Sequence, residues 1–208
     1  MSRAFAQIAQ TNTVRRVQAE RGVREANQRF LDPDHAAGDS LGENEKSFIA
    51  MRDGFYQATV SESGWPYVQF RGGPRGFLKS LDSKTLAYAD FRGNRQYIST
   101  GNVESDARVS LILMDYPNRA RLKVWGHAKL VDAELDPALA RAVAVSGYRA
   151  LVERTVVITV AAFDWNCPSH IPQRLTAEEM RPAIGKLHAR IAELEAENAE
   201  LRQRTEAN

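Results

Sequence analysis

Short runs of alternating apolar and polar residues fill the middle of the chain. Turn residues separate these runs, at 62–64, 82–84 and 116–118. This pattern is typical of half-buried strands joined by tight turns, and it favours a barrel over a doubly wound sheet. We expect strands at residues 55–61, 65–71, 76–81, 85–90, 109–115, 121–132 and 155–165.

Helical patterns interrupt and flank the predicted strands. Residues 13–31 are loosely amphipathic and end at the breaker sequence 32–34. Asp136 is followed by Pro137, a residue favoured in the first turn of a helix. We expect helices at residues 13–31, 43–51, 94–108 and 136–146.

The end of the chain has a heptad pattern. Its a and d positions hold Ile184, Leu187, Ile191, Leu194, Asn198 and Leu201. An Asn at an a position fixes the register of a parallel dimer at a cost in stability. We predict a coiled-coil-like helix that pairs with another copy, and a helix packed on its own domain stays open as the alternative.

These patterns divide the chain into three parts. We expect an N-terminal helical arm and linker at 1–41, a barrel at 42–175 and the C-terminal amphipathic helix at 176–208. A length of 208 residues fits one domain with an added helical element.

Composition and charge restrict the function. The net charge is only +2, so a general role in nucleic-acid binding is not expected. One cysteine, Cys167, excludes an internal disulfide framework and fits a reducing compartment. No apolar run is long enough for a membrane span, and the N-terminus lacks a signal-peptide pattern. We expect a soluble, cytoplasmic protein with no membrane partner.

Several kinds of chemistry lack their motifs. The four histidines are dispersed without metal-ligand spacing, so no metal site is expected. Neither a Walker A loop nor a Gly-x-Ser-x-Gly elbow is present, and the bend at 72–76 is not a dinucleotide fingerprint.

The segment from 66 to 96 holds the best candidate site. Gln69 and Arg71 lie two apart on one predicted strand, so their side chains share a face. Lys79 and Asp90 end the next two strands, and Asn94 is expected to cap the helix that follows. Cations and amides at a helix start suit a ligand with a phosphate and a hydrogen-bonding ring, such as FMN. Solvated strand-end charges are the alternative interpretation.

Residues 48–165 resemble the pyridoxamine 5'-phosphate oxidase-like FMN-binding split-barrel proteins. The likeness is closest to bacterial flavin-nucleotide-binding members that carry Arg-Gly-Gly-Pro, Gly-Asn-Arg and Asn-Cys-Pro-x-His-Ile-Pro-Gln-Arg. These motifs occur here at 71–74, 93–95 and 166–174. The resemblance implies a mainly β fold, a six-stranded antiparallel split barrel, and FMN bound at the interface of a homodimer.

The resemblance also assigns cofactor-binding positions. Gln69, Phe70 and Arg71 match the segment that lies along the flavin, and Lys79 matches a lysine associated with the cofactor. We add Asp90 because it ends a strand beside this segment.

The expected phosphate site departs from the family pattern. Asn94, Arg95 and Gln96 fall where the family uses a Ser-Arg-Lys triplet, so Arg95 would carry most of the phosphate charge, with help from Arg71 or Lys79. The C-terminal Arg-Leu-His signature of the oxidase proper is missing, so a true pyridoxamine 5'-phosphate oxidase is not expected.

The loop at 166–174 adds further candidates. Its two prolines fix an extended path from which His170 and Arg174 would reach a flavin or substrate, and a rigid connector is the alternative. The resulting hypothesis is an FMN-dependent oxidoreductase that passes electrons from NAD(P)H to a small organic acceptor; its catalytic residues are unknown. The alternative is a non-catalytic FMN- or haem-binding dimer for storage, sensing or scaffolding, with His170 or His127 as the haem ligand.

Overall fold

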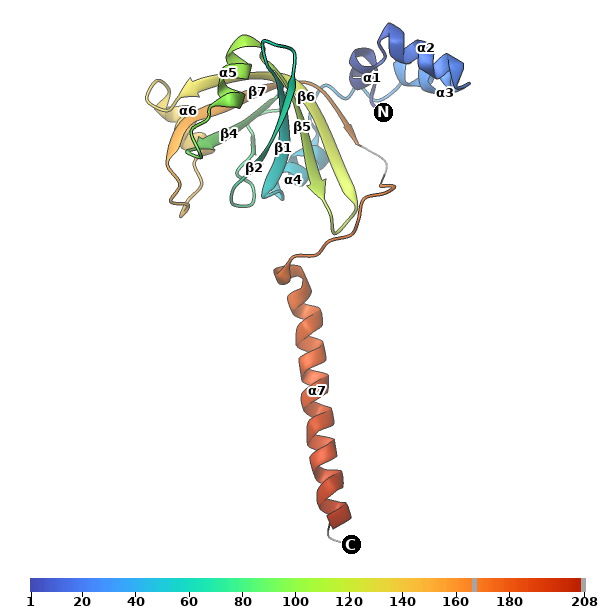
Figure 1. The fold of residues 1–208 in the computed structure, drawn as a ribbon, viewed down its shortest axis with the longest axis vertical. Coiled ribbons are helices and arrows are strands. Elements are labelled where there is room, and N and C mark those ends of the chain that lie inside the picture. Colours follow the sequence, from blue (N-terminus) through green and yellow to red (C-terminus); the bar gives the residue numbers. More distant parts are fainter. Residues whose placement is uncertain (166–167, 207–208) are drawn as a thin grey trace.

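The computed structural model describes residues 1–165 and 168–206, and its centre is one antiparallel sheet (Figure 1). The strands are β1 (Gly54–Val60), β2 (Pro66–Gly72), β3 (Lys79–Ser80), β4 (Thr85–Phe91), β5 (Arg108–Asp115), β6 (Ala120–Asp132) and β7 (Val152–Trp165). Their order across the sheet is β2-β1-β5-β6-β7-β4-β3.

The predicted mainly β fold with flanking helices is confirmed, and the sheet has the seven strands expected from the residue pattern rather than the six that the family resemblance implied. The seventh is β3, which is much shorter than the strand expected at 76–81. Gly76 has φ of 76°, and the amide of Phe77 donates to the carbonyl of Pro74, so the chain turns before it can pair. Only Lys79 and Ser80 pair with β4.

The helices differ more from prediction than the strands do. The helix expected at 13–31 is divided, because Gly22 takes φ of 68° in its middle. The helix expected at 94–108 is also shorter, and α1 was not predicted. The observed helices are α1 (Arg3–Ala9), α2 (Asn12–Glu20), α3 (Arg24–Gln28), the 3-10 helix η1 (Arg29–Leu31), α4 (Glu43–Ala50), α5 (Ile98–Ser105), α6 (Pro137–Val143) and α7 (Ala177–Glu206).

The sheet curls around an apolar core. Tyr88 on β4 donates its hydroxyl to Oε1 of Gln57 on β1, at 2.7 Å, although three strands separate β1 from β4 in the sheet. Both side chains are buried, and burial raises the pKa of the Tyr88 phenol. The core around them includes Ile49, Phe55, Phe77, Leu86, Leu111, Leu113, Leu122, Val124 and Ile158.

Short helices cover the outside of the sheet. Ala87 and Ala89 of β4 face away from the main core and pack with Val143 of α6, so β4 is buried on both faces. On β6, the Trp125 ring stacks on Phe5 of α1 with centroids 4.0 Å apart. The small alanines let a helix approach β4 near one edge of the sheet, and the aromatic stack holds the N-terminal arm against the central strand β6.

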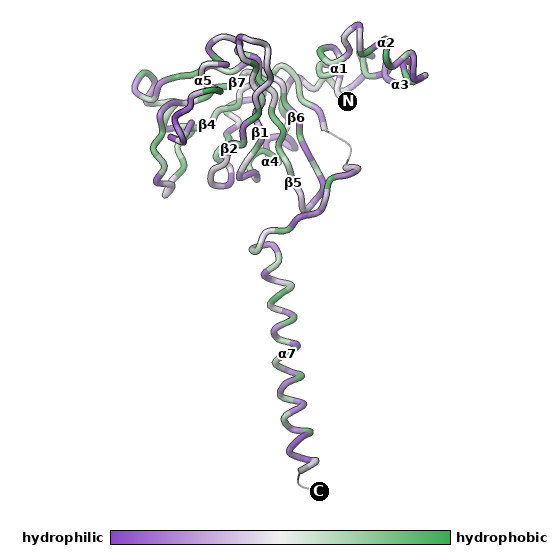
Figure 2. Tube along the Cα trace, viewed as in Figure 1, coloured by the Kyte–Doolittle hydropathy of each residue, from purple (hydrophilic) through white to green (hydrophobic). Residues whose placement is uncertain are grey.

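Helix α7 projects away from the sheet (Figure 1). Every described side chain from 177 to 205 is exposed, so this helix does not pack on its own domain. Figure 2 shows apolar and polar residues alternating along it, in contrast to the more continuous apolar stretches of the strands. Within residues 1–165 and 168–206, no helix is both long and apolar enough to cross a membrane.

We predict that Gly126 is required by the tight β6–β7 crossing. The register shifts between Trp125 and Gly126, and a Cβ at Gly126 would lie 2.5 Å from the carbonyl oxygen of Thr159. Gly126→Ala should lower the free energy of unfolding by about 1–3 kcal/mol, the usual cost of overpacking, measured by urea denaturation.

Gly101→Ala is the matched control, because a Cβ at this exposed position on α5 meets no atom within 4 Å. It should stabilise the protein by roughly 0.5–1 kcal/mol. Equal unfolding midpoints for the two variants would contradict this account of the crossing.

Candidate functional site

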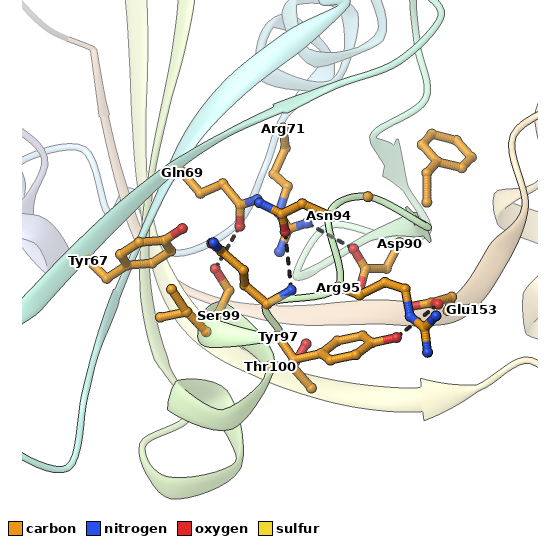
Figure 3. A pocket seen from close by; sticks show the side chains of 14 residues that line it. Tyr67, Gln69, Arg71, Asp90, Asn94, Arg95, Tyr97, Ser99, Thr100 and Glu153 are labelled. Atoms are coloured by element: carbon orange, nitrogen blue, oxygen red, sulfur yellow. Dashed lines mark hydrogen bonds and ion pairs between the residues drawn. The ribbon is translucent and has the colours of Figure 1, made fainter.

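A polar cavity of about 190 Å³ lies where β2, the end of β4, the start of α5 and β7 meet (Figure 3). Six of the ten expected cofactor-binding residues line it. They are Gln69, Arg71, Asp90, Asn94, Arg95 and Gln96. The curl of the sheet therefore brings together residues of β2 and β4 that pair with different strands.

The alternation of β2 determines which of its residues reach the cavity. Gln69 and Arg71 line it together with Tyr67, as expected for side chains two apart on one strand. Phe70 points to the opposite face, where it is 58% exposed and contacts Tyr56 edge-to-face. Phe70 is thus placed outside the cavity of its own chain.

Arg71 is held between β2 and β4 by Asp90. Its Nη1 donates to Asp90 Oδ1 at 2.9 Å, and Arg154 Nε lies 3.5 Å from the other carboxylate oxygen. Burial raises the pKa of Asp90, against the opposing effect of the two guanidinium groups. The Nε of Arg71 is buried and has no hydrogen-bond partner among the described residues, so this donor is unsatisfied in the single chain.

A second carboxylate, Glu153 on β7, bonds to three neighbouring side chains. It accepts from Arg92 Nε at 2.8 Å and from the Tyr97 hydroxyl at 3.1 Å, and it pairs with Arg154 at 3.0 Å. Hydrogen bonding from Arg92 lowers the pKa of Glu153.

The charged groups that line the cavity balance, with the guanidinium groups of Arg71 and Arg95 against the carboxylates of Asp90 and Glu153. Arg92 and Arg154 are not among the lining residues, but they form ion pairs with these two carboxylates, and Arg71 pairs with Asp90. Arg95 has no ion-pair partner within the described part of the chain. In Figure 3 its side chain runs along the rim of the cavity toward Glu153. Arg95 is therefore the cation best able to meet an anionic ligand.

The loop before α5 has an unusual backbone. Arg95 and Tyr97 have φ of 62° and 53°, in the left-handed region that non-glycine residues rarely adopt. Such backbone conformations concentrate at functional sites, because the surrounding structure must hold them in place. Here Tyr97 is held by its bond to Glu153 and by Arg154, whose guanidinium lies 5.2 Å from the ring centroid.

The prediction that Asn94 caps a helix is wrong. Its side chain accepts from the amide of Gln96 at 3.2 Å, and the left-handed residues delay α5 until Ile98. The start of α5 nevertheless lines the cavity through Ile98, Ser99 and Thr100, and it has no side-chain cap. Uncapped helix starts present free N–H groups and a positive dipole end.

Two hydrogen bonds position this helix start. Ser99 Oγ donates to Gln69 Oε1 at 2.9 Å, which ties α5 to β2. One turn later, Asn102 Nδ2 donates to Thr59 Oγ1 at 2.9 Å, and both residues are buried. The helix start is thereby fixed relative to β1 and β2.

Three other expected site residues do not line the cavity. Lys79 lies on the edge strand β3, where it pairs with Ala87. Arg174 stacks over the Tyr116 ring at 4.9 Å, beside the β5–β6 turn, and His170 is exposed in the same connecting segment. Asn166 and Cys167, which begin the conspicuous loop motif, lie outside the described residues.

The sequence analysis missed several lining residues. Tyr67 follows the same alternation as Gln69 and was open to prediction on that basis. Glu153 and Tyr97 gave no local signal, because their roles depend on β7 lying beside β4 and on a left-handed turn. In residues 1–165 and 168–206, no group of three or more His, Cys, Asp or Glu side chains is placed to hold a metal ion.

We predict that the Glu153 cluster stabilises the fold in a pH-dependent way. The pKa of Glu153 is lowered below its ordinary value of 4.5 in the folded protein. The stabilisation from its ionised carboxylate is therefore complete above pH 4.5 and is lost as the pH falls through the lowered pKa. Glu153→Gln should lower the melting temperature near pH 7, and the difference from the parent protein should shrink under acid.

Glu62→Gln is the control for this measurement. Glu62 lies on the exposed β1–β2 turn and forms no ion pair with any described residue. Its melting temperature should match that of the parent at every pH. A Glu153→Gln difference that stays constant from pH 7 to pH 3 would refute the ionic role of Glu153.

Comparison with known proteins agrees with the fold. A HupZ variant from Group A Streptococcus superposes with a TM-score of 0.50, at 16% identity, covering 61% of this chain and 99% of that chain. An FMN-binding protein from Syntrophomonas wolfei has a TM-score of 0.49 at 13% identity, covering 72% of this chain and 97% of that chain. Curated protein sequences gave no match. At such low identity, the likeness to HupZ concerns the fold alone.

The family is assigned by sequence. The family model described as pyridoxamine 5'-phosphate oxidase matches residues 41–165, which is more than half of the chain. The matched region extends from the residues just before α4 to the end of β7, so it contains the sheet and every residue that lines the cavity. The chain therefore belongs to the pyridoxamine 5'-phosphate oxidase family.

Proposed function

We propose that this protein is an FMN-dependent oxidoreductase that passes electrons from NAD(P)H to a small organic acceptor. The observation that carries the proposal is the combination of an unpaired cation, Arg95, with an uncapped helix start and an unpartnered donor on Arg71 in one cavity. Family membership supports flavin as the ligand that uses such groups.

The phosphate end fits the α5 side of the cavity. The first N–H groups of α5 and the Arg95 guanidinium, which has no ion-pair partner among the described residues, favour a dianion there. Arg95 would hold the phosphate through charge-assisted hydrogen bonds. The backbone N–H of Gln96 does not contact the phosphate in this arrangement, because it already donates to Asn94 Oδ1.

The ring end fits the β2 side. The amide of Gln69 and the free Nε of Arg71 offer hydrogen bonds to a polar heterocycle, and Asp90 fixes the orientation of Arg71. Burial of Arg71, whose side chain is 17% exposed, strengthens its electrostatic effect on a bound ring.

A second copy of the chain would complete the site. A cavity of about 190 Å³ is smaller than the roughly 300 Å³ or more of pockets that enclose drug-sized ligands. The outer face of β2, β1 and β5 supplies an apolar surface for pairing, because Tyr56, Val68, Phe70 and Ile112 share it and are 37–60% exposed. In such a homodimer, Phe70 would reach the flavin bound by the other copy.

The chain itself contributes binding, orientation and charge. Bound FMN would supply the hydride chemistry. Arg71 near the ring favours negative charge that develops there, while Gln69 and Ser99 keep their mutual hydrogen bond and fix the floor of the cavity. No proton-transferring residue is required of the described cavity lining, since hydride exchange proceeds without one.

Arg95→Ala should weaken FMN binding at least about tenfold. The expected loss is about 1.5 kcal/mol or more, the lower end for a hydrogen bond to a charged group. Isothermal titration of flavin-free protein with FMN measures the change, and titration with riboflavin, which lacks the phosphate, should show little effect of the substitution.

Arg119→Ala is the matched control. Arg119 also has a left-handed φ, of 52°, but it lies in the β5–β6 turn away from the cavity. Both substitutions place Ala in the same strained backbone, so a shared loss of affinity would indicate backbone damage. Unchanged FMN affinity in Arg95→Ala would show that Arg95 does not hold the phosphate.

The enzyme assignment is tested by turnover. FMN-loaded protein should oxidise NADH or NADPH faster with a quinone or nitroaromatic acceptor than an equal concentration of free FMN does. A flavin spectrum without this acceleration would reject the oxidoreductase in favour of an FMN-binding dimer, and a Soret band would indicate haem instead.

A further inference from the structure

Helix α7 presents an apolar stripe that its own domain leaves uncovered. Ile184, Leu187, Ile191, Leu194 and Leu201 are 39–64% exposed along one side of a 30-residue helix. Apolar side chains at this spacing on a helix ordinarily face a partner. The stripe therefore lacks its packing surface in a single chain.

The residue types on the stripe specify the number of strands and their direction. The a positions 184 and 191 hold Ile, and the d positions 187, 194 and 201 hold Leu. β-Branched residues at a combined with Leu at d favour two parallel strands. In the single chain, Asn198 at the next a position donates Nδ2 to the carbonyl of Leu194, at 2.9 Å.

We propose that α7 pairs with α7 of a second copy as a parallel, in-register two-stranded coiled coil. In this pairing each g position faces the e position five residues later on the other helix. Arg190 then faces Glu195, and Glu197 faces Arg202, so both charged g–e pairs are attractive, and twofold symmetry doubles them.

The antiparallel alternative fits the same sequence poorly. Packing a positions against d positions in the reverse direction, with Ile191 opposite Leu194, places Asn198 against Leu187. The Asn amide would then be buried against an apolar side chain without a partner, which is costly. The same register brings Arg181 near Arg202, two like charges, and Arg190 near Glu197, an attractive pair, so the buried Asn198 rather than the flanking charge decides against it. In-register parallel pairing instead places Asn198 against its counterpart.

This pairing does not depend on flavin. It uses only residues of α7, which lie outside the cavity and outside the family match at 41–165. The coiled coil is thus a second self-association surface, separate from the apolar face proposed on the sheet.

Cysteine cross-linking in the full-length chain tests direction and register together. In a Cys167→Ser background, Ile184→Cys and Leu201→Cys should each form disulfide-linked homodimers under mild oxidation. Ala196→Cys, on the outer f position of the same helix, is the control and should cross-link at least tenfold more slowly. Cross-linking no faster than this control would overturn the proposal. Slow cross-linking is also the result expected if α7 pairs with a different protein instead of a second copy.

Mixing the two variants, distinguished by tags of different mass, tests direction. In the parallel pairing, positions 184 and 201 are about 25 Å apart along the axis, so no mixed disulfide is expected. In the antiparallel pairing they face each other, and a predominance of mixed disulfides would reject the parallel arrangement.

The charge pairs give an independent readout. Glu197→Arg should slow cross-linking at Leu201→Cys roughly fivefold or more, since two exposed ion pairs become repulsive. Adding Arg202→Glu should restore the rate. Glu200→Arg makes the same change on the outer face and should leave the rate unchanged; equal effects at 197 and 200 would contradict the assigned register.

Discussion

The ion pair between Arg71 and Asp90 joins two strands that are separated by four others in the sheet. It forms only because the sheet curls until β2 approaches β4, and the buried hydrogen bond from Tyr88 to Gln57 holds the same approach one layer deeper. The cavity lies where β2 approaches β4. Without the curl, Gln69 and the loop before α5 would lie at different places on an open sheet.

Much of the sheet was predictable, because alternation is a local property. The strand predicted at 109–115 is observed at Arg108–Asp115, and every second residue from Val109 is buried: Val109, Leu111, Leu113 and Asp115. The helix start was not predictable. Arg95 and Tyr97 take left-handed conformations that carry no signal in a sequence, since Gly or Asn is the usual residue there.

The site residues were likewise predictable in part. Gln69 and Arg71 were placed together correctly from their spacing on one strand, and the same spacing rule separates Phe70 from them. His170 and Arg174 were expected to reach the ligand because two prolines fix an extended loop around them, yet Arg174 contacts Tyr116 at the β5–β6 turn. Spacing predicted which side chains share a face. Which distant segments meet depends on how the sheet closes, and no local pattern encodes that.

The position of β7 between β6 and β4 also constrains how the chain can fold. Thr85 of β4 pairs with Thr159 of β7, so one edge of β4 stays unpaired until β7 has been synthesised much later. Pairings between distant segments form slowly. Until then, residues 86–90, all buried in the finished fold, present an apolar strand with an unpaired edge, the kind of segment that aggregates. During synthesis, the wall of the cavity that carries Asp90 is thus also a segment exposed to aggregation.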